Sequence, residues 1–167
     1  AGLTPTIGGA TPAIARQLIH DPDVLNAAAI DFGRIVHRLP GAVHRPASST
    51  DIADLLHWAG QQGLKGAARG QGHSTYGRAQ AAGGIVVDMS TLRAIGDIRP
   101  DRIVVDAGAT WKDVFEAALV HGLTPPVLTN YLGLSIGGTI AVGGIGGSSS
   151  RYGMQTDQVL ELDVVTG

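Results

Sequence analysis

The segment from Ala68 to Ser74 combines backbone and side-chain types that suit a phosphate-bearing ligand. Gly70 and Gly72 flank a polar turn, and a histidine, His73, follows at once. Glycine adopts positive φ angles and, without a Cβ atom, lets backbone N–H groups approach a ligand closely. Successive N–H groups in such a turn form an anion-binding nest. We therefore predict that His73 touches whatever the turn holds.

A second glycine-dense segment, Gly133–Gly147, begins about 60 residues further along the chain, and seven of its fifteen residues are glycine. The chain contains 25 glycines among 167 residues, about twice the usual content. The residues alone leave two interpretations open. Either His73 belongs to a site, or the two segments are unrelated loops and His73 is merely hydrogen-bonded in one of them.

The standard signatures for nucleotides, metals and nucleophiles are not met. Neither Gly70-Gln71-Gly72 nor Gly144-Ile145-Gly146 continues as G-x-G-x-x-G, and no G-x-x-x-x-G-K-[ST] motif occurs. The six histidines form no H-x-x-x-H or H-E-x-x-H pair, so no metal site is predicted. No serine lies in a G-x-S-x-G elbow. These absences argue against a Rossmann domain, a P-loop enzyme, a zinc hydrolase and a serine hydrolase.

Composition narrows the class of protein further. With 44% hydrophobic and 16% charged residues, the chain can bury a core as one medium domain or two small lobes. A net charge of −2 and 4% aromatic residues argue against nucleic-acid binding. The absence of cysteine excludes disulfides and thiolate chemistry. No apolar run approaches the roughly 20 residues of a membrane helix.

The first thirteen residues are small and rich in proline and glycine. Two interpretations remain open: the remnant left after a signal peptide is removed, or a frayed terminus. The location, either cytoplasmic or exported with removal of a signal peptide, stays open with them.

Helices and strands are expected to alternate along the chain. Ser48–Asp51 carries N-cap residues, and the apolar residues that follow at i, i+3, i+4 and i+7 predict a helix over residues 52–59. Thr110 and Asp113 predict a capped helix with a buried Trp111 stripe. A softer helix is expected over residues 135–142, and a short one over 11–19 that ends in a turn at 20–22. Strands are expected over residues 33–37, 66–69, 85–88, 102–106 and 159–165.

This alternation predicts an α/β or α+β fold, and we take α+β as the fold class. We divide it into an N-terminal extension with a short helix (residues 1–33), a first lobe (34–97) and the start of a second lobe (98–167). The strand expected at 159–165 needs neighbours that the remaining sequence does not supply, so the fold is expected to be incomplete.

Two long stretches resemble FAD-linked oxidases of the vanillyl-alcohol-oxidase type, which carry an FAD-binding PCMH-type domain, and are most similar to cytokinin dehydrogenases. Arg69–Gln80 followed by Gly83–Met89 resembles the segment that binds the flavin covalently. Asn130–Thr139 followed by Gly143–Ile145 resembles the second flavin segment, and Val159–Gly167 matches the strand after it. The resemblance implies the N-terminal part of a two-lobed FAD-binding domain that lacks its substrate domain.

The resemblance also implies a role for each matching residue. Ala68, Gly70, Gln71 and Gly72 would wrap the FAD pyrophosphate, and His73 would be bonded through a ring nitrogen to the flavin 8α-methyl group. Ser74 and Arg78 would lie beside the cofactor. The second segment would meet the pyrophosphate and adenosine through a further set: Ser135, Gly137, Gly138, Ala141, Gly144 and Ile145.

The expected activity is flavin-dependent oxidation of an amine of the cytokinin type, or of an alcohol, by hydride transfer to covalently bound FAD. Asn130 stands where cytokinin dehydrogenases carry a catalytic aspartate. An amide orients a substrate but cannot act as a general base, so amine oxidation is in question. The alternative is a non-catalytic FAD-binding or structural module. The expected partners are a small-molecule substrate and the remainder of the same enzyme, with no nucleic acid and no membrane span.

Overall fold

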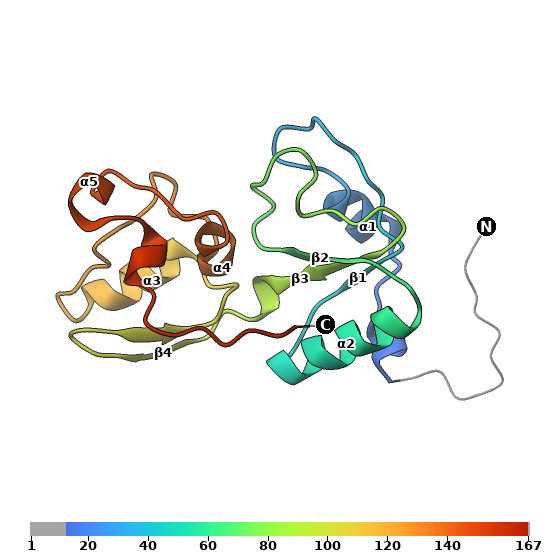
Figure 1. Cartoon of the computed structure of the whole chain (residues 1–167), viewed down its shortest axis with the longest axis horizontal. Helices are drawn as coiled ribbons and strands as arrows, with labels where there is room; N and C mark the ends of the chain where they lie inside the picture. The colour runs from blue at the N-terminus through green and yellow to red at the C-terminus, as the bar shows by residue number, and fades with distance from the viewer. Residues whose placement is uncertain (1–12, 167) are drawn as a thin grey trace.

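The computed structural model describes residues 13–166, a mixed arrangement of helices and strands as predicted. The interpretations of residues 1–12 and of Gly167 lie outside the described residues. The elements form two groups, one around a three-stranded sheet and one around a two-stranded sheet (Figure 1). The division into an extension and two lobes stays a prediction, and its boundary between residues 97 and 98 falls inside strand β4 (Ile95–Ile98).

The first group is built on a parallel sheet with the strand order β1-β3-β2. β1 is Ala42–His44, β2 is Gly66–Arg69 and β3 is Ile85–Asp88. Ile85 pairs with Ala42 on one side and with Gly66 on the other. The apolar run of β3 is buried on both faces, as expected for the central strand of a covered parallel sheet. β2 and β3 are strands predicted from the sequence, whereas β1 was missed.

Helices cover both faces of this sheet (Figure 1). Helix α2 (Ser49–Gln61) packs Leu55 and Ala59 against Ile85 and Val87. Helix α1 (Pro22–Ala28) lies on the opposite face, in the core cluster that contains Val86. Because successive strand side chains point to opposite faces, the alternation along β3 assigns each helix its side.

A turn is predicted at residues 20–22, but a helix begins at Pro22, so the prediction is wrong for this last residue. The side chain of Asp21 accepts hydrogen bonds from the backbone N–H groups of Asp23 and Val24, and Pro22 occupies the first helical position. Proline suits that position because its fixed φ is helical and its missing N–H has no helical partner there. The 3-10 helix Ile14–Gln17 falls within the helix predicted for residues 11–19.

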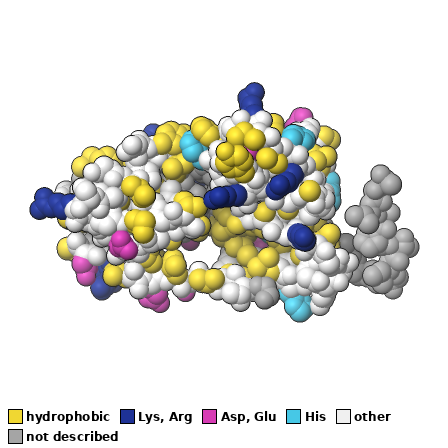
Figure 2. Space-filling view, turned by 45° about the horizontal axis from the view of Figure 1, so that its top comes forward, with side chains coloured by type: hydrophobic (Ala, Val, Ile, Leu, Met, Phe, Trp, Pro, Cys, Tyr) yellow, Lys and Arg dark blue, Asp and Glu magenta, His cyan; other side chains and the backbone are white. Residues whose placement is uncertain are grey.

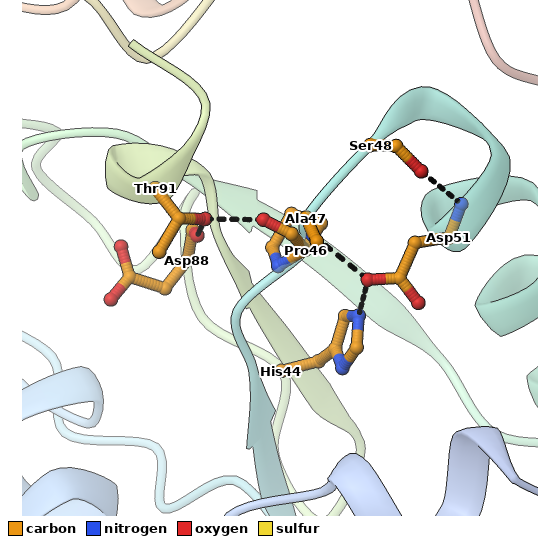
Figure 3. A network of polar contacts seen from close by, with 7 residues as sticks. All are labelled: His44, Pro46, Ala47, Ser48, Asp51, Asp88 and Thr91. Carbon is orange, nitrogen blue, oxygen red and sulfur yellow. Dashed lines mark hydrogen bonds and ion pairs between the residues drawn. The ribbon is translucent and has the colours of Figure 1, made fainter.

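Helix α2 starts at a polar network that also closes the carboxyl end of β1 (Figure 3). The N–H of Asp51 donates to the hydroxyl of the N-cap Ser48. The Asp51 carboxylate accepts from the N–H of Ala47 at 2.9 Å and contacts Nε2 of His44 at 3.2 Å. His44 is fully buried. The capped start predicted at Ser48–Asp51 is confirmed.

The second group contains an antiparallel pair, β4 and β5 (Ile103–Val105). Helix α3 (Trp111–Leu119) has the predicted capping box between Thr110 and Asp113. Helix α4 (Ile136–Ile140) lies within the predicted softer helix. The indole N–H of Trp111 donates to the buried hydroxyl of Thr139 at 2.8 Å, which ties α3 to α4. Helix α5 (Ser149–Tyr152) and the 3-10 helices Met89–Thr91 and Gln155–Gln158 complete the elements.

Two predicted strands are absent from the described residues. Residues 33–37 form a loop in which only His37 makes a bridge, to Ile30. Residues 159–165 pair with no strand, and Leu160, Leu162 and Val164 are exposed. An apolar alternation becomes a strand only where a neighbour accepts and donates its backbone hydrogen bonds, and no strand within residues 13–166 pairs with this segment.

Candidate functional site

The loop that follows β2 begins at the carboxyl edge of the parallel sheet, where ligands of such sheets bind. Gly72 has a φ of +70°. A Cβ atom there would lie 2.3 Å from Nη2 of Arg69, so a side chain would collide with the guanidinium as well as strain the backbone. The conformation of this loop therefore requires a glycine at position 72, where the sequence predicted a phosphate-binding turn.

Arg69 lies beneath this loop. Its Nη1 donates to the carbonyl of Ile30 and its Nη2 to the carbonyl of Ala27, both at 3.3 Å. Burial lowers the pKa of Arg69 below its ordinary value, and the negative charge of Asp88 acts in the opposite direction. A guanidinium stays protonated in proteins, so a positive charge supports the loop from below.

Gly70 and Ser135 bring the two glycine-dense segments together. A Cβ atom on Gly70 would lie 2.0 Å from Oγ and 3.0 Å from Cβ of Ser135. Ser135 is 4% exposed and is the N-cap residue of α4. Gly138, one turn into that helix, also faces the Ser135 hydroxyl. The two segments are therefore in direct contact and are not unrelated loops.

The imidazole of His73 lies between two aromatic rings. Its centroid is 3.7 Å from that of Phe32, with the planes tilted by 32°. The ring of Tyr131, next to Asn130, stacks at 5.2 Å and 26°. His73 makes no side-chain hydrogen bond within the described part of the chain. Aromatic contacts from both groups of elements thus surround the histidine predicted to hold the flavin.

A cleft of about 440 Å³ opens at the carboxyl ends of the three parallel strands. Gly70 and Gln71 line it together with α1 residues and with Arg45, which forms a 3.1 Å ion pair with Asp88. A larger hollow, of about 700 Å³, lies over β4 and the end of α3 and contains none of the predicted site residues. Figure 2 shows one face hollowed between the two groups, with hydrophobic side chains around the hollow.

The remaining predicted site residues are more scattered. Ala68 lies within β2, and the carbonyl of Ser74 accepts the Phe32 N–H at 3.1 Å. Gly137 packs against Ala107, and Gly144 packs against Gln155. Seven predicted residues expose their side chains to solvent: Ala68, Gln71, Ser74, Arg78, Asn130, Ala141 and Ile145. A role in cofactor binding stays a prediction for every residue of this set.

Sequence reasoning missed Phe32, Tyr131 and the supporting role of Arg69. One signal was available for the aromatic residues, because the chain has only two phenylalanines and three tyrosines. Phe32 and Tyr131 stand next to Asp31 and Asn130, polar residues in loops. A rare, exposed aromatic in a polar loop is a candidate for ring recognition.

Among residues 13–166, no cluster of three or more histidine, aspartate or glutamate side chains capable of holding a metal occurs. None of their helices has the length and apolar character needed to cross a membrane.

The chain is similar to known proteins over most of its length. The model of the FAD binding domain family matches residues 40–167. An uncharacterized oxidoreductase in the fasciation locus of Rhodococcoides fascians is 47% identical over 149 residues, which is 89% of this chain and 34% of the relative. Cytokinin dehydrogenase 10 of Oryza sativa subsp. japonica is 48% identical over 92% of this chain and 30% of its own length. Cytokinin dehydrogenase 4 of Arabidopsis thaliana is 41% identical over 90% and 32%. The chain thus spans about a third of the length of these relatives.

Proposed function

Because this chain belongs to the FAD binding domain family, we propose that it is the cofactor-binding part of a flavin-dependent oxidoreductase that holds FAD covalently through His73. In this proposal its two groups of elements are the two lobes of a PCMH-type FAD-binding domain. The remainder of the same enzyme, including a substrate domain, is the expected partner.

The contact between Gly70 and Ser135 carries the proposal. It supports one continuous binding surface that runs from the loop after β2 to the start of α4, with His73 beside it. Ser135 and the Arg69 guanidinium occupy the places where Cβ atoms of Gly70 and Gly72 would stand, which packs the loop closely. In this proposal the backbone N–H groups of the loop bind the pyrophosphate oxygens. The positive charge of Arg69 favours the same anion.

The chain's own residues would bind and orient the cofactor, whereas the flavin supplies hydride acceptance when bound. Ala68 to Gly72 hold the pyrophosphate, and Ser74 and Arg78 flank the flavin side. On the second segment, contacts to the pyrophosphate and adenosine come from Ser135, Gly137, Gly138, Ala141, Gly144 and Ile145. Ala141 contributes only backbone groups, because its methyl group neither donates nor accepts.

The substrate proposed is an amine of the cytokinin type or an alcohol. Two relatives that bear the name cytokinin dehydrogenase support the amine. Asn130 argues the other way, since its exposed amide cannot take a proton. In this proposal Asn130 orients the substrate, and an Asn130→Asp variant of the full-length enzyme is expected to raise the rate of amine oxidation. An unchanged rate means that another group accepts the proton or that the substrate is not an amine.

Acid precipitation tests covalent attachment. The full chain is incubated with FAD and denatured in acid, and the washed pellet is examined for flavin absorbance and, by mass spectrometry, for a bound flavin. We expect flavin in the wild-type pellet and none with His73→Ala. Flavin that washes out of the wild type contradicts covalent attachment, and a wild type that binds no flavin contradicts the whole proposal.

Asn130 favours a second candidate function, a non-catalytic FAD-binding or structural module. The two functions differ in one spectroscopic property. An oxidoreductase loses the visible absorbance of its flavin when substrate is added without oxygen, whereas a module keeps it. The test requires the full-length protein, because the chain spans about a third of its relatives.

A further inference from the structure

We propose that Phe32 and Tyr131 form an aromatic bracket that fixes the orientation of the His73 imidazole. Phe32 precedes β1 in the sequence and Tyr131 precedes α4, so the two faces of the bracket come from distant parts of the chain. The bracket itself is a property of the polypeptide. Its purpose, to present a ring nitrogen to the flavin methyl group, rests on the proposed function.

The Phe32 face is held by hydrogen bonds at Phe32 itself and at the preceding Asp31. The Phe32 N–H donates to the carbonyl of Ser74, the residue after His73, at 3.1 Å. The preceding residue, Asp31, is 4% exposed and accepts the N–H of Ile35 at 2.7 Å. Phe32 is therefore tied directly to the segment that carries the histidine. Its ring lies 3.7 Å from the imidazole although 60% of the residue remains exposed.

The Tyr131 face depends on a glycine. A Cβ atom on Gly133 would lie 2.7 Å from both Cζ and the hydroxyl oxygen of Tyr131. The tyrosine ring therefore folds over Gly133, in space that any other residue would fill. The Tyr131 carbonyl accepts the Thr129 hydroxyl at 3.0 Å, which fixes the turn. The ring is thereby directed to the side of the imidazole.

The rings of Phe32 and Tyr131 replace the hydrogen bond that usually orients a histidine ring. A functional imidazole is normally oriented by a hydrogen bond from one of its nitrogens. His73 makes no such bond within residues 13–166, so both nitrogens stay available at the ring edge. Aromatic pairs are stabilised beyond the area they bury in preferred ring arrangements, so the two contacts favour one orientation of the imidazole.

Phe32 and Tyr131 are positioning residues in this account, because they act on His73. If either ring is lost, the imidazole turns more freely and reaches the productive geometry less often. Misplacement of a reacting group by about 1 Å can slow a reaction by roughly a hundredfold. We expect the loss of either ring to slow covalent attachment by about tenfold or more.

The first experiment observes the bracket without any cofactor. The His73 ring protons of the full chain are identified in NMR spectra by their absence from His73→Gln. Because they lie over two aromatic faces, we expect upfield signals that move to ordinary positions in Phe32→Leu and Tyr131→Leu. Phe32→Tyr retains a ring and should keep the shift. The matched control is Tyr152→Leu, which removes an exposed tyrosine that contacts Arg151.

Two results bear directly on the bracket. Upfield signals that respond only to the two bracket residues support it. Ordinary signals in the wild type, or upfield signals that survive both leucine variants in a chain with unchanged circular dichroism, overturn it. These outcomes do not depend on whether His73 ever reacts with flavin.

The second experiment measures the rate of covalent FAD incorporation, from acid-precipitated samples taken over time, alongside non-covalent FAD affinity. We expect Phe32→Leu and Tyr131→Leu to incorporate FAD at least about tenfold more slowly, with Kd within about threefold of wild type, and Phe32→Tyr and Tyr152→Leu to react normally. Normal rates in both leucine variants overturn the positioning role. If the wild type never attaches FAD, covalent attachment fails, and the NMR result alone decides the bracket.

Discussion

At the scale of single residues, the candidate site depends on glycines, which have no Cβ atom. Gly70 and Ser135 approach so closely that no Cβ atom fits between them, and Gly72 leaves room for the Arg69 guanidinium. The small size of Gly70 allows two distant segments to touch, whereas other glycines of the chain allow turns. Gly60, on an exposed part of α2, has nothing within 4 Å of its Cβ position.

A comparison of the variants Gly70→Ala and Gly60→Ala tests this difference. At Gly70 the methyl group would overlap the Ser135 hydroxyl, so we expect a loss of about 1–3 kcal/mol in unfolding free energy and weaker FAD binding. At Gly60 the same methyl group meets open space in a helix, so we expect a gain of about 0.5–1 kcal/mol. Urea unfolding and flavin titration report both effects. Equal behaviour of the two variants would falsify the close contact.

The carboxyl group of Asp31, next to Phe32 of the aromatic bracket, makes the stability of the fold depend on pH. Burial alone would raise the pKa of this carboxyl group, but hydrogen bonds from the backbone N–H groups of Ile35 and Val36, with the nearby N–H groups of Tyr76 and Gly77, leave it below its ordinary value of 3.8. A folded-state pKa below the unfolded one stabilises the fold above the unfolded value. That contribution is lost as the pH falls through the folded value.

We therefore expect the unfolding free energy of the wild type to fall more steeply below about pH 4 than that of Asp31→Asn. The replacement keeps an oxygen that can accept from Ile35 but does not titrate. Urea unfolding from about pH 6 down to about pH 2.5 measures the two slopes, with Asp54→Asn on the exposed side of α2 as the control. Parallel curves for wild type and Asp31→Asn would contradict the assignment.

At the scale of elements, the start of α2 is held by more than its N-cap serine (Figure 3). Asp51 accepts from Ala47 and contacts the buried Nε2 of His44, so one carboxylate joins the end of β1 to the first turn of the helix. The hydroxyl of Thr91 donates to the carbonyl of Pro46 at 2.6 Å, which ties the same turn to the end of β3. This network holds the carboxyl edge on which the cleft opens.

Asp51→Ala should cost about 1–3 kcal/mol in unfolding free energy, because it leaves the buried His44 nitrogen and the Ala47 N–H without their acceptor. Asp54→Ala, one turn later on the exposed face of α2, should stay within about 0.5 kcal/mol of wild type. Thermal and urea unfolding compare the two. Similar losses in both variants would show that helix charge, and not the network, accounts for the effect.

At the scale of the whole molecule, the segment at residues 159–165 exposes apolar side chains and joins no strand of the described residues. Leu160, Leu162 and Val164 are exposed by 76%, 59% and 71%. An unpaired extended segment with an apolar face is a template for association with another chain. The family relatives are about three times as long as this chain, which supports a role for further residues in covering the segment.

For the chain of 167 residues, we expect Leu160→Lys to reduce concentration-dependent association and to change the unfolding free energy by less than about 0.5 kcal/mol. Light scattering and sedimentation measure association, and urea unfolding measures stability. Glu161→Gln shifts the net charge by the same amount at the neighbouring position. If it reduces association equally, net charge rather than the apolar face is responsible.

The sequence by itself determined the elements whose causes are local. Ser48 and the Thr110–Asp113 box marked where two helices begin, and the continuous apolar run of β3 marked a buried strand. It also carried the family resemblance that the FAD binding domain match confirms. These features depend on neighbouring residues, so a linear pattern is sufficient to find them.

Only the tertiary structure decided which of those segments meet. The packing of the two groups of elements against each other places the loop after β2 against the start of α4, and it sets His73 between Phe32 and Tyr131. Contacts between residues so far apart depend on how whole elements pack, which no local pattern records. The same reason explains residues 159–165, where the alternation is present but residues 13–166 supply no partner strand.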